Sequence, residues 1–494
     1  MRVARILMLA AAAGAACRVS SAPSPVVSSI GSSAALRAMI DSMADAPQFA
    51  NAHWGILIVD PERGDTLYSR NAGKLFMPAS NMKILTSSVG MAQLGMDYRY
   101  KTTFAARGAV SGGTLAGDLV VIGRGDPSVS DHMLGDAMIP IRAIADSIAR
   151  RGIQHIAGRI VASGNAFPDA SLGFGWSYDD FEDSYSAPTD ELMFNEGFSE
   201  IHVTGGARPG DPPQIVVRPA KSFPVVHVSA TTGPDVKRDS AGRRANSLTA
   251  RKDSATWEIT LSGQIAPGDT ATIEVTHHDA DVAYLAAVKE ALREKGIAVD
   301  GGASDTTARL DTLTVLTSPP LSEIMKALMK PSQNQIAEIL YRTIALNATG
   351  IGRSDTASAV IGRQLAKWGV DPNEVVIRDG SGLARYDYVS PRTLVRVLDV
   401  MRRAPTFRPY YDAMPIAGVD GTIRNRMKGT AAQGNVHAKT GTLAMARSLS
   451  GYVTTANQRM LIFSFLCNNW TTPVREVERV QDIIATRLAT MSVP

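Results

Sequence analysis

The sequence predicts an α+β fold in which an antiparallel sheet, covered by helices, is interrupted by a long insertion. Strand patterns occur near both ends of the chain, as a hairpin over 53–70 and as three consecutive strands over 436–466. Helical patterns follow Pro78 and dominate again from 321 to 368. The region between, about 97–317, has a different texture of short strands and turns. We therefore expect the two halves to share one sheet and the middle to form sheets of its own.

The elements before the insertion each have a local signal. A short amphipathic helix is expected around 36–43, where apolar residues recur at helical spacing. The hairpin strands, 53–59 and 65–70, flank an Asp-Pro-Glu-Arg-Gly turn. Pro78 then marks the entrance of a helix, because proline is favoured in the first helical turn.

The remaining elements follow from the same periodicities. In the insertion we expect strands over 98–104, 115–122, 156–161, 214–217, 257–262 and 271–276, and helices over 133–151 and from about 281 to 296. In the C-terminal part we expect helices over 321–329, 332–346 and 356–368, strands over 436–439, 448–454 and 460–466, and a final helix opened by Thr472 and Pro473.

Length and composition set broad limits. A chain of 494 residues is too long for one hydrophobic core, so two to four domains are expected. The content of 45% hydrophobic and 20% charged residues is ordinary for a globular protein. The net charge of +4 is spread along the chain without a basic cluster, so we expect no nucleic-acid partner.

The N-terminus has the pattern of a secretory signal peptide, expected over 1–22. Two arginines precede an apolar run over 6–16 that is too short to span a bilayer. Residues 23–33 resemble a flexible linker. Lipidation at Cys17 stays open but is less favoured, because Gly14 stands where a larger aliphatic residue is usual. We expect an exported protein of the periplasm or cell envelope, without a transmembrane span in the mature chain and with Cys467 as a buried free thiol.

A Ser-x-x-Lys motif, Ser80 to Lys83, stands at the helix entrance after Pro78. Residues three apart share a helix face, so the Ser80 hydroxyl and the Lys83 amine are expected to be neighbours. A serine becomes a strong nucleophile when an adjacent base takes its proton, and a lysine with a lowered pKa is such a base. Alone, the motif also fits a helix cap followed by a solvated lysine.

Two later segments make the catalytic interpretation far more specific. Ser332 and Asn334 open another expected helix, and Lys439 begins a Lys-Thr-Gly-Thr run at an expected strand. The three motifs, in this order and in these contexts, are typical of β-lactamases and penicillin-binding proteins. The chemistry fits: Ser80 would attack a carbonyl carbon, Lys83 would take its proton, and Ser332 would relay a proton to the leaving amine. Lys439 would add positive potential that favours a neutral Lys83.

The other motif residues are suited to bind a substrate. The Asn334 side chain offers its amide N–H groups as donors and its carbonyl oxygen as an acceptor to a peptide backbone. The hydroxyls of Thr440 and Thr442 can bind a carboxylate, and Gly441 would let the substrate lie against the strand edge. The backbone N–H groups of Ser80 and Thr442 are the expected oxyanion-hole donors.

With these motifs the chain resembles the D-alanyl-D-alanine carboxypeptidase/endopeptidase family, the class C low-molecular-mass penicillin-binding proteins. The resemblance covers most of the mature chain; Gln333 replaces the commoner aspartate. Further matching segments are Gly125-Asp126-Pro127-Ser128, Tyr185-Ser186-Ala187-Pro188, Asp379-Gly380-Ser381-Gly382-Leu383, Ala417-Gly418-Val419-Asp420-Gly421-Thr422 and Ser448-Leu449-Ser450-Gly451-Tyr452-Val453.

The resemblance implies a penicillin-recognising, β-lactamase/transpeptidase-like catalytic domain split by two smaller, mostly β domains. The expected limits are 34–97 and 318–494 for the catalytic domain, 98–122 and 195–317 for domain II, and 123–194 for a nested domain III. The resemblance further implies serine D-alanyl-D-alanine carboxypeptidase activity on peptidoglycan stem peptides, with or without cleavage of cross-links. It also implies acylation by β-lactams and the absence of a metal or organic cofactor.

Two other functions stay open. A β-lactamase or esterase on the same domain would need a base for fast deacylation. Glu191, in the segment Glu-Leu-Met-Phe-Asn that resembles an E-x-x-L-N element, is the residue to test, although it lies in the insertion. A non-catalytic peptidoglycan-binding or penicillin-sensing protein has no physical need for four intact catalytic residues. His277 and His278 lack a metal-ligand spacing, and a polar strand end is the simpler interpretation.

Overall fold

The computed structural model describes residues 29–236, 244–253, 256–302 and 306–493. The expected signal peptide, with Cys17, lies outside these residues. The expected linker is wrong in its last part, because helix α1 (Ser29–Ala44) already begins at Ser29. Residues 29–33 are Ser, Ile, Gly, Ser and Ser, none of them a strong helix former, so this extension has no local signal in the sequence. Within the described ranges, no helix is long and apolar enough to cross a membrane.

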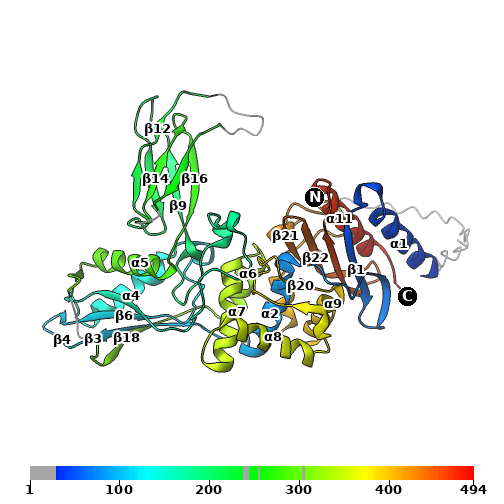
Figure 1. Ribbon diagram of the computed structural model, residues 1–494, viewed down its shortest axis with the longest axis horizontal. Helices are drawn as coiled ribbons and strands as arrows, with labels where there is room; N and C mark the ends of the chain where they lie inside the picture. Colours follow the sequence, from blue (N-terminus) through cyan, green and yellow to red (C-terminus); the bar gives the residue numbers. More distant parts are fainter. Residues whose placement is uncertain (1–28, 237–243, 254–255, 303–305, 494) are drawn as a thin grey trace, which may run out of the picture.

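A five-stranded antiparallel sheet joins the two halves of the chain, as the strand patterns predict. It forms the split domain, built from the chain before β3 (Lys101–Arg107) and after β18 (Leu310–Thr317) (Figure 1). In spatial order its strands are β2 (Asp65–Arg70), β1 (His53–Asp60), β23 (Met460–Asn468), β22 (Ala446–Thr454) and β21 (His437–Leu443).

Alternating side chains of the sheet enter two hydrophobic cores. Trp54 and Ile56 of β1 point to a core shared with α1 and α11 (Val474–Thr490). Leu57 belongs to the opposite core, which a group of helices covers. These helices are α2 (Met82–Leu94), α6 (Leu321–Met329), α7 (Asn334–Thr349), α8 (Ser354–Lys367), α9 (Pro391–Arg403) and α10 (Phe407–Ala413). The period of two along β1 thus buries both faces of the sheet.

The insertion contains two further cores. The first lies between a four-stranded sheet and two helices that are in contact with each other, α4 (Met138–Arg150) and α5 (Ala280–Glu294). The order of this sheet is β18, β3, β6 (Asp118–Ile122) and β8 (Ile160–Ser163). A smaller sheet beside it contains β17 (Ala298–Val299), β7 (His155–Ile156), β5 (Thr114–Leu115) and β4 (Val110–Ser111).

The second core of the insertion belongs to an all-β lobe that projects away from the rest of the molecule (Figure 1). Its strands are β9 (Phe198–Thr204), β10 (Gln214–Arg218), β11 (Val226–Val228), β12 (Thr231–Thr232), β13 (Thr249–Lys252), β14 (Ile259–Ser262), β15 (Gln264–Ile265) and β16 (Thr270–Thr276). They form three small sheets around one core.

The expected division of the insertion is therefore wrong. Residues 123–194 do not form a nested domain: β8 pairs with β6, and α4 shares its core with β3 and α5. The nested unit is instead the lobe from β9 to β16, within the expected domain II. The local patterns predict individual strands but not their partners, because pairing across long separations leaves no signal in a short window.

Candidate active site

Ser80 lies in a 3-10 turn, Ala79–Asn81, that leads into α2. Ala79 has φ of 48°, a left-handed conformation that is strained by about 1–3 kcal/mol for a residue with a side chain. Three hydrogen bonds hold this turn against the sheet: Asn81 Nδ2 to the Lys439 carbonyl (2.9 Å), Ser448 Oγ to the Pro78 carbonyl (2.7 Å) and the Met77 amide to Asn468 Oδ1 (2.9 Å). The sheet therefore fixes the position of Ser80.

The structure brings Ser80 and Lys83 together, as their spacing predicts. Lys83 Nζ lies 2.9 Å from Ser80 Oγ. The same amine donates to Asn334 Oδ1 at 2.6 Å and to the Ser381 carbonyl at 2.8 Å. Asn334 is oriented in turn, because its Nδ2 donates to the Tyr185 carbonyl at 2.7 Å. Three chain segments thus meet at this amine, and the segment of Tyr185 is joined to it through Asn334.

Lys83 is fully buried, and burial lowers its pKa to about 7. The negative charges of Asp379, Glu338 and Asp387 oppose this shift. Desolvation is therefore the main cause of the lowered pKa of Lys83. The expectation that Lys439 also favours the neutral form of Lys83 stays a prediction. Lys439 is also fully buried, and burial, followed by the repulsion of Lys83, lowers its pKa well below the ordinary value.

Ser332 and Lys439 form the second hydroxyl–amine pair. Lys439 Nζ, on β21, donates to Ser332 Oγ at 2.6 Å and to the Thr440 carbonyl at 2.8 Å. Ser332 does not start the helix as expected: α7 begins at Asn334, with the Gln333 side chain capping its first amides. Ser332 lies in the preceding turn with φ of 70°, a second strained residue at the site.

Gly441 is required for a reason that the sequence does not reveal. A Cβ atom built on it would lie 2.2 Å from Ser448 Oγ, 2.5 Å from the Pro78 carbonyl oxygen and 2.9 Å from the Ser80 nitrogen. These atoms belong to the protein and not to a substrate. The glycine lets β21 pack directly against the turn that carries Ser80.

The two threonines of the Lys-Thr-Gly-Thr run already have partners. Thr440 Oγ1 lies 2.7 Å from Thr422 Oγ1, which belongs to one of the segments that matched the family. Thr442 Oγ1 accepts from Arg447, whose guanidinium also pairs with Glu478 of α11. Each hydroxyl therefore has a fixed position beside the cavity.

The motif residues surround a cavity of about 530 Å³, within the range for small-molecule sites. Lys83 and Lys439 do not line it but lie behind it. Its walls are formed by Ser80, Asp180, Tyr185, Ser332, Asn334, Gly382, Leu383, Arg385, Thr422, Thr440, Gly441, Thr442, Leu443 and Ala444. Asp180, Arg385, Leu443 and Ala444 belong to none of the motifs or matching segments, and only the fold brings them to the cavity.

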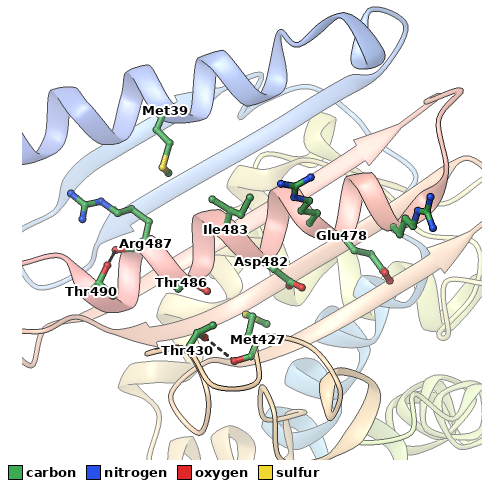
Figure 2. Close-up of a pocket in the computed structure, with 11 residues that line it drawn as sticks. Met39, Met427, Thr430, Glu478, Asp482, Ile483, Thr486, Arg487 and Thr490 are labelled. Atoms are coloured by element: carbon green, nitrogen blue, oxygen red, sulfur yellow. Dashed lines mark hydrogen bonds between the residues drawn. The ribbon is translucent and has the colours of Figure 1, made fainter.

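A second cavity, about 570 Å³, lies between α1 and α11 (Figure 2). Met39 of α1 points toward α11, and Glu478, Asp482 and Ile483 line the α11 side. Its cations are arginines, which stay protonated and cannot act as bases. The chemistry therefore favours the cavity at Ser80 as the active site, although it is slightly smaller.

The loop after Asp379 is the main feature that the motifs miss. Asp379 accepts from the amides of Gly382 (2.6 Å) and Ala384 (2.7 Å) and from Trp176 Nε1 (3.0 Å). Glu338 of α7 is buried, and its Oε1 accepts from the amides of Gly380 and Ser381 at 3.1 and 2.7 Å. These carboxylates shape the loop that presents the Ser381 carbonyl to Lys83.

Gln333, which replaces the commoner aspartate of the family, has a structural role. Its Oε1 accepts from the Gln335 amide at 2.6 Å, and its Nε2 donates to Glu196 Oε2 at 2.6 Å. Glu196 accepts from Ser130 Oγ at 2.8 Å through its other oxygen. An amide can donate and accept at once, which an ionised aspartate cannot, so Gln333 links the start of α7 to the insertion.

The residues considered as alternatives lie elsewhere. Glu191 is half-buried, accepts from the Phe167 amide at 3.1 Å and does not line the cavity. His277 is buried against Ser199 at 2.9 Å, and His278 stacks on Trp257. In the part of the chain that the structure describes, no group of three or more His, Cys, Asp or Glu side chains could hold a metal ion. Cys467 is buried and unpaired, as expected.

Known proteins are similar to this chain in sequence and in fold. A D-alanyl-D-alanine carboxypeptidase from Actinomadura sp. is 34% identical over 472 residues, which cover 92% of this chain and 84% of that protein. The crystal structure of penicillin binding protein 4 (dacB) from Haemophilus influenzae matches with a TM-score of 0.75 at 23% identity, over 92% of this chain and 99% of that one. The same Haemophilus protein, solved in complex with a β-lactam, matches with a TM-score of 0.72 at 22% identity, over 92% and 99% of the two chains. The structural matches confirm the mixed α+β fold.

The family model for D-Ala-D-Ala carboxypeptidase 3 (S13) matches residues 36–491, nearly the whole described chain. The match includes the insertion as well as the three motifs. The chain therefore belongs to the D-Ala-D-Ala carboxypeptidase 3 (S13) family and is a serine-type carboxypeptidase.

Proposed function

We propose that this protein hydrolyses the terminal D-alanyl-D-alanine bond of peptidoglycan stem peptides through an acyl-enzyme on Ser80. One observation carries the proposal: the set of partners around Lys83. A neutral amine has two hydrogens and one lone pair. Two of its three partners, the Asn334 and Ser381 carbonyl oxygens, can only accept. The hydrogens go to them, and the lone pair faces the Ser80 hydroxyl, the partner with a proton to give.

In the acylation step, Ser80 Oγ attacks the carbonyl carbon of the scissile amide while Lys83 takes its proton. The bond between this carbon and the D-Ala nitrogen then breaks. Ser332 Oγ gives its proton to the leaving amine and takes another from Lys439 Nζ, so Ser332 remains a hydroxyl and Lys439 becomes neutral. Water then hydrolyses the Ser80 ester: the proton of the attacking water returns to Lys439 through Ser332, and Lys83 returns its proton to Ser80 Oγ. No step requires a metal or an organic cofactor.

The proposed oxyanion hole consists of the Ser80 and Thr442 amides. Both residues line the cavity, and the Ser80 nitrogen lies close to Gly441, the neighbour of Thr442. Two N–H groups aimed at the developing negative charge stabilise the transition state by several kcal/mol. The hydroxyls of Thr440 and Thr442 line the cavity near the buried amine of Lys439 and are suited to hold the terminal carboxylate of the substrate.

The same chemistry extends to two related substrates. Cleavage of a cross-link whose carbonyl comes from D-Ala would make the protein a D,D-endopeptidase as well. A β-lactam presents a reactive amide and a carboxylate to the same groups, so we expect it to acylate Ser80. The N-terminal signal pattern supports export to the periplasm or cell envelope, where these substrates occur.

The test is the mass of the intact protein after mixing with benzylpenicillin, with Ser80→Ala as the control, together with D-Ala release from a pentapeptide that ends in D-Ala-D-Ala. We expect one persistent penicillin adduct on the wild type alone, and D-Ala release by the wild type alone. Rapid penicillin hydrolysis without an adduct would favour the β-lactamase alternative. An unmodified wild type beside intact penicillin and intact peptide would favour a non-catalytic protein.

A further inference from the structure

The exposed aromatic side chains of this protein are not scattered. Among the residues that the structure describes, the exposed large aromatic side chains are Phe174, Tyr178, Tyr185 and Tyr386. Tyr185 belongs to the cavity wall. The other three are 67%, 85% and 55% exposed, in the order Phe174, Tyr178 and Tyr386. We call these three residues the aromatic ridge. Phe174 and Tyr386 are in ring contact, and Tyr178 follows Phe174 by four residues on the same segment. Exposed rings grouped in this way mark an interaction surface.

The ridge stands on a packed base. Trp176 is buried with Leu383 and Ala384 in a small core of its own, and Trp176 Nε1 donates to Asp379 at 3.0 Å. The Arg385 amide donates to the Gly175 carbonyl at 3.3 Å, which ties the two segments together. The rings of Phe174 and Tyr386 lie 5.7 Å apart. The rings are therefore presented by a fixed platform.

The platform borders the active-site cavity at two points. Asp180 and Arg385 line the cavity, and each lies within two residues of a ridge ring. Tyr185 OH donates to Asp180 Oδ1 at 2.8 Å, which fixes this part of the rim. The part of a bound substrate that extends out of the cavity on this side reaches the ridge next.

The surroundings of the rings are polar and carry both charges. The Arg378 guanidinium lies 6.0 Å from the centre of the Phe174 ring, and Asp179 is exposed beside Tyr178. A protein partner would require a more continuous apolar patch. A sugar suits this surface better, because its C–H face stacks on an aromatic ring while its hydroxyl and acetamido groups need polar partners at the ring edges.

We propose that the aromatic ridge binds the glycan strand from which the stem peptide extends. This inference rests on the proposed function: the scissile bond is at the carboxyl end of the peptide, and the opposite end is attached to a sugar. With the carboxyl end in the cavity, the three preceding residues of the stem peptide span roughly 10 Å and cross the rim, and the glycan follows beyond them, where the ridge lies. The ridge then increases affinity for glycan-linked peptides and takes no part in the chemistry.

The test compares two substrates and two variants. The substrates are a free pentapeptide ending in D-Ala-D-Ala and the same pentapeptide on an uncross-linked glycan strand. The ridge variant is Phe174→Ala/Tyr178→Ala/Tyr386→Ala. The control, Ile139→Ala/Val216→Ala, removes apolar side chains that are 56% and 51% exposed elsewhere in the insertion. We expect the ridge variant to lose about tenfold in kcat/KM on the glycan-linked substrate and less than about twofold on the free peptide. The control should match the wild type on both.

A direct binding measurement completes the test. Peptide-free glycan strands should bind the wild type and the control variant but not the ridge variant. Equal losses on both substrates, or no loss on the glycan-linked one, would overturn the proposal. A loss that appears only with cross-linked peptidoglycan would assign the ridge to a second peptide strand and overturn it too. If the wild type turned over neither substrate, the proposed function would fail, and strand binding alone would decide on the ridge.

Discussion

Glu338 offers the sharpest test of how the loop after Asp379 serves Lys83. Its buried Oε1 accepts from the amides of Gly380 and Ser381, at 3.1 and 2.7 Å. The carbonyls of the same two residues accept from α2, Gly380 from Thr86 Oγ1 at 2.7 Å and Ser381 from Lys83 Nζ at 2.8 Å. The Glu338 carboxylate thus holds the N–H groups of the loop, while a carbonyl group of the same loop orients Lys83, the proposed base.

Two substitutions separate its effects. Glu338→Ala leaves two buried N–H groups without an acceptor, at about 1–3 kcal/mol each, so we expect a loss of about 2–6 kcal/mol in the free energy of unfolding. Glu338→Gln keeps an oxygen of the same shape and should retain most of the stability. It also removes a group that, when ionised, raises the pKa of Lys83. Because burial raises the pKa of Glu338 itself to about 7, this charge is partly neutralised where Lys83 titrates, so the acidic limb of the rate profile should move only slightly, to lower pH.

Urea unfolding measures the first effect, and the pH dependence of penicillin acylation measures the second. The reasoning would be refuted if Glu338→Ala unfolded within about 1 kcal/mol of the wild type. It would equally fail if Glu338→Gln moved the acidic limb to higher pH, because the charge would then have the opposite influence on Lys83.

Three further outcomes follow from single positions. Acylation of the wild type should slow as the pH falls below about 7, because Lys83 then gains the proton that it must accept from Ser80; a rate that rises toward acid would contradict this. Gly441→Ala should abolish most acylation by colliding with the Ser80 turn, whereas Gly362→Ala, on α8 with no atom within 4 Å of the new Cβ, should stabilise the fold by about 0.5–1 kcal/mol. Cys467 should resist alkylation until the protein unfolds, since burial raises the pKa of its thiol. If the folded protein were alkylated as fast as an exposed thiol, this burial would be refuted.

The sequence predicted the motifs and their local contexts well, because helix entrances and strands leave signals within a few residues. The Ser80–Lys83 contact follows directly from helical spacing. The contact between Lys83 and Asn334 required the three motifs to be interpreted together, since 251 residues separate the two positions. Ser381 lies in a segment that matches the family, but nothing in the sequence indicates that its backbone oxygen contacts Lys83, because every residue has such an oxygen.

In the insertion, the sequence does not predict which strands pair with each other. The local patterns predict several of its strands but miss β9 and β18, two of the longest, and they place 123–194 in a different unit from the segment with which it packs. β8 pairs with β6 in parallel through a connection that includes α4, and neither strand is long enough to indicate its partner. The same limit applies to Gly441, where the sequence suggested space for a substrate and the structure shows contact with the protein itself.

The pairing of the first strands with the last has a consequence for the order in which this protein is made. His53 of β1 pairs with Asn468 of β23, a separation close to the full length of the chain. Lys101 and Thr317, at the two ends of the insertion, are paired with each other, so the insertion can close early by itself. Contacts between distant segments form late in folding. The sheet that positions Ser80 therefore cannot close until the strand ending at Asn468 has been synthesised, and until then the nucleophile and the Lys-Thr-Gly strand stay apart. A nascent chain would carry no working peptidase, however far its export had advanced.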